Sequence, residues 1–143
     1  MISGRKNSSW PFTIILLIGL IVLPNFAARA DGDKGGGVLD GKVFLGTIGQ
    51  SSDAQYQDKL QFNNGMFWSE ICTRCGFQPG KYWTRTSEGE THFRGEMTGG
   101  YGTFVYSGKI INGKAVVDVF WEKKRWYWTS SRKLSFDGSL KSA

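Results

Sequence analysis

The stretch from Gly102 to Glu122 reads GTFVYSGKIINGKAVVDVFWE, and it decides the fold. In its second half Val117 and Val119 alternate with Asp118, and successive side chains of a strand point to opposite faces. At its centre Asn112-Gly113 tolerates the positive φ angles of a tight primed turn. The stretch therefore predicts an antiparallel β-hairpin with one apolar and one mixed face.

The same pattern continues over most of the chain. Phe93, Gly95 and Met97 alternate with charged neighbours, and two further tight turns are predicted at 63–65 and 87–90. No helical periodicity is present after residue 37, apart from a possible turn around 52–58. Strands are predicted at 41–49, 58–63, 66–71, 81–87, 91–97, 102–110, 114–122 and 125–136.

Eight strands joined by short links must be antiparallel neighbours, so the predicted fold class is all-β. A single up-and-down barrel of about eight strands is favoured over a sandwich, because closure removes the exposed edges. The interior of such a barrel is either filled by side chains or holds one small ligand. An outer-membrane barrel is disfavoured, because Lys, Arg and Glu recur at alternate positions of the strands.

The first 30 residues have the pattern of a cleavable export signal. Arg5 and Lys6 precede an uncharged apolar run at 12–23, and Ala28-Arg29-Ala30 has the small residues that signal peptidase requires. The run is too short to span a bilayer. We therefore predict a signal peptide at 1–30, a flexible Gly-rich leader at 31–37, a barrel domain at 38–143, and a periplasmic or extracellular location.

A family resemblance covers most of the predicted domain. Its motifs are Leu60-x-Phe62-x-Asn64-Gly65-x-Phe67-x-Ser69, then Cys72, then Gly76-Phe77-x-x-Gly80-x-Tyr82, and finally Gly108-x-Ile110-x-x-Gly113. Together they resemble small exported bacterial β-barrel proteins of the lipocalin-like (calycin) type, most of which have no assigned function. The resemblance implies an antiparallel barrel that binds small, often apolar molecules.

Aromatic residues make up 15% of the chain, and many are adjacent, so rings must lie on both faces of the strands. Trp68 and Trp83 are predicted to lie outside, where they could contact a protein partner. The inner set would form either a packed core or the wall of a ligand pocket. This predicted set comprises Phe62, Phe67, Tyr82, Phe93, Phe104, Tyr106, Trp121 and Trp128.

The pair Cys72-x-x-Cys75 admits several interpretations. Haem attachment would require a histidine at position 76, where the chain has glycine, and a tetrahedral metal site would need more ligands than one histidine and carboxylates readily supply. A redox pair would need a helix after the first cysteine, which Gly76 to Gly80 does not favour. A structural disulfide in an oxidising compartment is the favoured interpretation, with free thiols as the alternative.

Other polar features give weak functional signals. His92 shares a strand face with Arg94 and Glu96, which could tune an acid or base but is more typical of a solvated face. Asp118 is expected to point outward. The basic run 123–125 could contact a polyanion, but a solvated hairpin tip is favoured, and no nucleic-acid partner is predicted.

These observations favour a binding protein over an enzyme. The predicted function is binding of a small apolar or aromatic ligand inside the barrel, without a metal or other cofactor. The alternative is an envelope-associated interaction or inhibitor module that uses Trp68 and Trp83.

The export hypothesis makes a direct prediction about the covalent mass of the protein. Protein purified from the cell envelope or medium should begin at Asp31, because the small residues of Ala28-Arg29-Ala30 precede that position. Intact-mass spectrometry measures this directly. A chain that keeps residues 1–30 in that fraction would contradict the prediction.

Overall fold

The computed structural model describes residues 37–51 and 55–142. The predicted signal peptide and most of the predicted leader lie outside the described residues, as does part of the turn expected around 52–58. The described elements are β1 (Val43–Gly49), β2 (Tyr56–Asn63), β3 (Met66–Ser69), α1 (Glu70–Arg74), β4 (Gly80–Ser87), β5 (Glu90–Gly99), β6 (Gly102–Ile111), β7 (Lys114–Lys124) and β8 (Thr129–Leu140).

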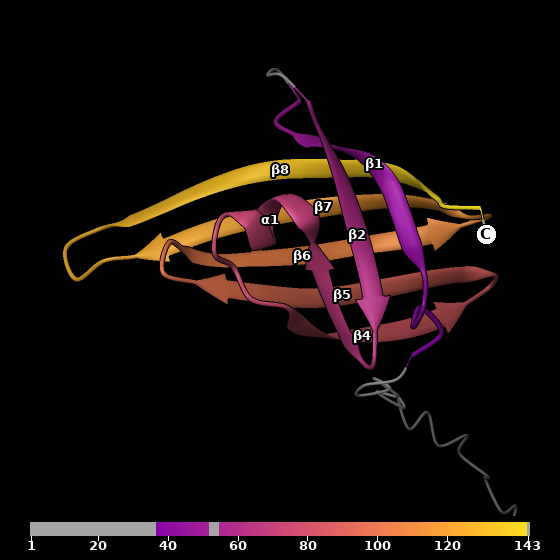
Figure 1. Cartoon of the computed structure of the whole chain (residues 1–143). Coiled ribbons are helices and arrows are strands. Elements are labelled where there is room, and N and C mark those ends of the chain that lie inside the picture. Colours follow the sequence, from indigo (N-terminus) through magenta and orange to yellow (C-terminus); the bar gives the residue numbers. More distant parts are fainter. Residues whose placement is uncertain (1–36, 52–54, 143) are drawn as a thin grey trace, which may run out of the picture.

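The eight strands form one closed antiparallel barrel in chain order, and β8 pairs with β1 to close it (Figure 1). This confirms the predicted fold class and the up-and-down topology. The barrel is consistent with a lipocalin-like fold. Among the described residues, no helix is long and apolar enough to cross a membrane.

Three hairpin turns show the backbone geometry that the sequence predicts. Asn64 and Gly65 both have positive φ, at 50° and 71°, and so do Asn112 and Gly113, at 49° and 74°. Glu88 adopts a φ of 51° before a glycine in the third turn. Positive φ at both central residues is the type I′ geometry, whose twist matches that of the flanking strands.

The alternation predicted for β5 and β7 is confirmed. Phe93, Met97, Val117 and Val119 are buried, whereas Arg94, Glu96 and Asp118 are exposed. Gly95 lies in the same inner row, and a Cβ atom there would come within 2.3 Å of the Phe67 ring. The absence of a side chain at this position therefore makes room for an aromatic ring in the barrel.

Aromatic rings pack against one another inside the barrel. The Phe62 ring has its centroid 5.0 Å from that of Tyr82, 5.3 Å from that of Phe93, and 6.0 Å from those of Phe44 and Phe67. All five side chains are at most 4% exposed. Most contacts are edge-to-face, which is a favourable arrangement for aromatic pairs.

One end of the barrel is covered by the chain that precedes β1. Leu39 is 1% exposed, and the Asp40 carboxylate accepts hydrogen bonds from the Tyr82 hydroxyl at 2.6 Å and from the Gly65 amide at 3.0 Å. These bonds tie the segment before β1 to the β2–β3 turn and to β4. The short helix α1 lies at the opposite end of β3 (Figure 1).

Two elements differ from the sequence prediction. The strand expected at 66–71 ends at Ser69, and α1 follows it, because Ser69 caps the first turn by accepting a hydrogen bond from the Cys72 amide. The last strand was expected at 125–136 but runs from Thr129 to Leu140. Residues 125–128 form the hairpin tip instead, closed by a hydrogen bond from the Arg125 amide to the Trp128 carbonyl oxygen.

The ring contacts predict the effect of removing their central member. Phe62→Ala should lower the free energy of unfolding by about 3–5 kcal/mol, because it removes a buried ring and leaves a cavity among the surrounding side chains. Denaturant unfolding followed by circular dichroism measures the change. The matched control is Trp126→Ala, at a site that is 94% exposed, which should change stability by less than about 0.5 kcal/mol. Equal effects of the two substitutions would contradict the packing described above.

Candidate functional site

The structure separates the eight predicted inner residues into three groups. Five belong to the buried core, namely Phe62, Phe67, Tyr82, Phe93 and Tyr106. Phe104 and Trp121 are partly buried and pack against that core from one end. Trp128 is 49% exposed at the hairpin tip, so its predicted inward position is wrong.

A hollow of about 580 Å³ lies at the α1 end of the barrel and is mostly apolar in character. Phe104 and Trp121 contribute from β6 and β7, and the Phe77 ring packs against that of Phe104 at 4.8 Å. This site, called the α1 hollow below, is lined by Ile71, Cys72, Arg74, Cys75, Phe77, Tyr101, Phe104 and Trp121.

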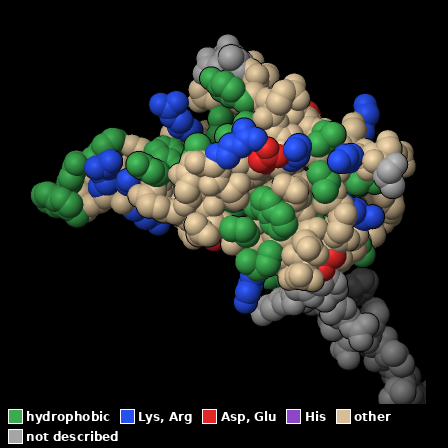
Figure 2. Space-filling model, viewed as in Figure 1, with side chains coloured by type: hydrophobic (Ala, Val, Ile, Leu, Met, Phe, Trp, Pro, Cys, Tyr) green, Lys and Arg blue, Asp and Glu red, His purple; other side chains and the backbone are tan. Residues whose placement is uncertain are grey.

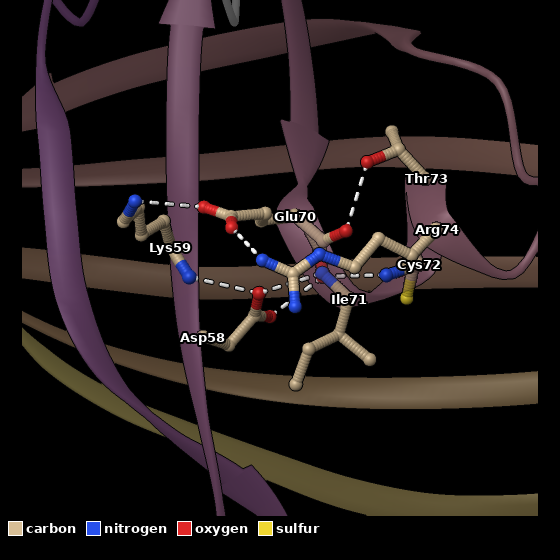
Figure 3. A network of polar contacts seen from close by, with 8 residues as sticks. Asp58, Lys59, Glu70, Ile71, Cys72, Thr73 and Arg74 are labelled. Carbon is tan, nitrogen blue, oxygen red and sulfur yellow. Dashed lines mark hydrogen bonds and ion pairs between the residues drawn. The ribbon is translucent and has the colours of Figure 1, made fainter.

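A buried carboxylate fixes the helix that forms one wall of the α1 hollow (Figure 3). Asp58 is 5% exposed and accepts hydrogen bonds from the Ser69 hydroxyl at 2.6 Å and from the Ile71 amide at 3.0 Å. The Lys59 amide donates a third bond at 2.8 Å. A carboxylate that accepts hydrogen bonds at the start of a helix satisfies donors that the helix itself leaves unpaired.

The outer side of α1 carries a small ion-pair group. Glu70 accepts from the Lys59 ammonium group at 2.9 Å and also pairs with Arg74, one helical turn further on (Figure 3). The hydrogen bond from Lys59, together with the positive charges of both partners, lowers the pKa of the Glu70 carboxyl group. Lys59 and Arg74 are exposed and Glu70 is partly exposed, so the ion pairs orient the helix surface but add little stability.

The two cysteines are free thiols in the structure, so the predicted disulfide is not formed. The Cys72 sulfur lies in the barrel, 3.1 Å from the Tyr106 hydroxyl oxygen, whereas Cys75 is exposed at the end of α1. Both residues lie within or directly after a helix that sequence reasoning missed. The helical geometry directs one sulfur into the core and leaves the other on the surface.

The environment of Cys72 suppresses thiolate formation. Burial raises the pKa of the Cys72 thiol, although hydrogen bonds from Ser69 and Tyr106 partly oppose that effect. Burial also raises the pKa of Tyr106 well above its usual value. The pair is therefore neutral near pH 7, and of its two members Cys72 lines the α1 hollow whereas Tyr106 lies in the core.

His92 and Asp118 face outward, as predicted. Both line a shallow groove of about 540 Å³ on the outer face of β4 to β7, together with Trp83 and the basic residues Arg85, Arg94 and Lys109. His92 lies 3.2 Å from a Glu90 carboxylate oxygen, and both side chains are partly exposed. This arrangement is typical of a solvated strand face with paired charges.

Trp68 and Trp83 are less exposed than the sequence suggested. Trp68 is partly buried and packs against the core, and Trp83 has intermediate exposure. In the register of β3 and β4, Met66 lies opposite Lys81, so the two tryptophans are not cross-strand neighbours. The interaction proposed for them stays a prediction.

Sequence reasoning missed several residues of the α1 end. Ile71, Phe77 and Tyr101 line the hollow, but they lie in the helix and connecting segments, where strand alternation gives no information. Asp58 was detectable, because it shares the inward-facing row of β2 with Leu60 and Phe62. An acidic residue in an otherwise apolar row indicates a buried, hydrogen-bonded carboxylate.

Comparisons with known proteins give no further assignment. No protein-family model matches the chain, and the comparisons with curated proteins and with solved structures found no match. Within the part of the chain that the structure describes, no group of three His, Cys, Asp or Glu side chains is placed to hold a metal ion. The candidate site therefore rests on the geometry of the α1 end.

The thiol geometry predicts very different reactivities for the two cysteines. In the Cys75→Ser variant, the remaining Cys72 should react slowly with Ellman's reagent, and its rate should still be rising at a pH where an ordinary thiol is fully ionised. The sign follows from the raised pKa, because a smaller fraction is thiolate at any given pH. In the Cys72→Ser control, the exposed Cys75 should react rapidly. A native chain with no titratable thiol before reduction would contradict the free-thiol structure.

Proposed function

We propose that this chain is an exported, lipocalin-like barrel protein that binds a small apolar or aromatic molecule in the α1 hollow. The observation that carries the proposal is the cluster of Phe77, Phe104 and Trp121 around an open hollow of about 580 Å³. That volume lies in the range of small-molecule sites. The proposed ligand site is therefore the α1 hollow and not the middle of the barrel, because packed aromatic rings fill the middle.

The lining of the hollow suggests how a ligand would be held. Aromatic rings offer large apolar contact area, and edge-to-face contacts favour another aromatic ring between Phe104 and Trp121. Arg74 lies at the helical side of the hollow and is exposed, so a ligand could also carry a polar or anionic end. The lipocalin-like resemblance implies small, often apolar ligands, and the aromatic lining of the hollow suits that class.

Hydrogen bonds fix two walls of the α1 hollow, namely the helix α1 and the β5–β6 turn. Asp58 and Ser69 hold the start of α1, and the Trp121 indole N–H donates a hydrogen bond to the Tyr101 carbonyl oxygen at 2.9 Å. The latter bond fixes the β5–β6 turn against β7. Preformed walls favour binding, because less conformational entropy is lost when the ligand enters.

An uncharged fluorescent probe tests the proposal. N-phenyl-1-naphthylamine should bind the full chain with a gain in emission, and Trp121→Leu should weaken that binding by about tenfold, which corresponds to the loss of one ring contact of about 1.4 kcal/mol. Titration of the probe into each variant at fixed protein concentration gives the dissociation constants. Circular dichroism shows whether the variants keep the barrel.

The matched control is Trp83→Leu, which removes a tryptophan of the outer groove and leaves the α1 hollow intact. It should bind the probe as tightly as the unaltered chain. Absence of probe binding, or equal weakening by the two substitutions in folded protein, would overturn the assignment of the site.

A further inference from the structure

The β7–β8 hairpin extends beyond the rest of the barrel. The last pair between β6 and β7 joins Thr103 to Glu122, and the last pair between β1 and β8 joins Gly49 to Ser135. Beyond the pair of Glu122 with Ser131, β7 and β8 continue as a two-stranded ribbon, which projects from one end of the barrel (Figure 1). The ribbon therefore presents its tip away from the packed body of the protein.

Three consecutive aromatic residues occupy that tip. Trp126 is 94% exposed, Tyr127 is 59% exposed and Trp128 is 49% exposed. Their rings contact one another, with centroids 4.9 Å apart for the first pair and 6.1 Å apart for the second. Exposing a contiguous group of large apolar rings to water is unfavourable in free energy. Such a group therefore indicates a contact site.

Beyond Glu122, whose carboxylate lies 3.4 Å from the Lys124 ammonium group, the ribbon carries only positive charge. The segment 123–133 contains five basic residues and no acidic residue. Arg125 lies over the Trp128 ring at 5.7 Å, and the other four basic residues lie on the strands behind the aromatic tip. Figure 2 shows this order, with hydrophobic side chains at the end of the projection and Lys and Arg beside and behind them.

We propose that the hairpin tip docks on an anionic lipid bilayer. Tryptophan and tyrosine prefer the boundary between the acyl chains and the headgroups, because their rings are apolar and their N–H and O–H groups still reach polar partners. Lysine and arginine placed behind them meet the anionic headgroups. The order of side chains along the projection thus matches the order of layers at a membrane surface.

This order favours a bilayer over a soluble polyanion. A polyanion site needs cations along its contact surface, whereas here the outermost residues are Trp126 and Tyr127, and most of the cations lie behind them. The docking site also adjoins the α1 end. Lys123 donates a hydrogen bond to the Gly100 carbonyl oxygen at 3.1 Å and lies over the Tyr101 ring at 5.2 Å, so the base of the ribbon joins the rim of the α1 hollow.

Vesicle binding tests the proposal without reference to any ligand of the hollow. The full chain should co-sediment with phosphatidylcholine vesicles that contain phosphatidylglycerol, and should bind pure phosphatidylcholine vesicles at least about tenfold more weakly. The double variant Trp126→Ser/Trp128→Ser should lose at least about tenfold in binding to the anionic vesicles. In the native chain, tryptophan emission should shift to shorter wavelength on binding, because rings leave water.

Trp83→Ser is the matched control, and it should bind anionic vesicles as the unaltered chain does. The proposal is overturned if the native chain does not bind these vesicles, or if it binds both vesicle types equally. It is also overturned if the double variant binds the anionic vesicles as tightly as the native chain does. It is overturned as well if heparin displaces native and double-variant protein from vesicles equally, since a soluble polyanion would then be the occupant. Circular dichroism establishes that each variant is folded.

Discussion

The limited width of an eight-stranded barrel is the constraint on which the rest of this structure depends. Its interior is just wide enough for side chains to fill, and here the Phe62 ring contacts four other aromatic rings. Gly95 leaves the space that the Phe67 ring fills. A core of this kind stabilises the barrel and fills its middle. Other molecules can therefore bind only at its ends or on its outer surface.

Most of the fold could be predicted from the sequence, because barrel strands and their turns are local signals. Asn64-Gly65 and Asn112-Gly113 mark type I′ turns, and the period of two in β5 and β7 identifies the inward-facing side. The site was harder to predict. Phe104 and Trp121 were assigned to the interior, but whether an inward residue is central or near an end depends on the stagger between strands, which the sequence does not state.

Two wrong predictions have clear physical causes. The run Trp126-Tyr127-Trp128 has high strand propensity, yet the pairing of Lys124 with Thr129 makes it a tip, because the register of β7 with β8 overrides local preference. The helix α1 has only five residues, too few for periodicity to show. It depends on a tertiary contact, since the Ile71 amide donates a hydrogen bond to the carboxylate of Asp58 on β2, 13 residues earlier.

Two acidic residues, Asp40 and Asp58, lie at different ends of the barrel and hold different segments there. At one end, Asp40 draws Tyr82 and Gly65 toward the preceding segment, and Leu39 covers the core. At the other, Asp58 holds a short helix to one side, so Phe104 and Trp121 are only partly covered. The first end is thus covered by Leu39, whereas the second keeps the α1 hollow. The apolar hollow and the aromatic hairpin share that second end, which is why binding and docking are both proposed there.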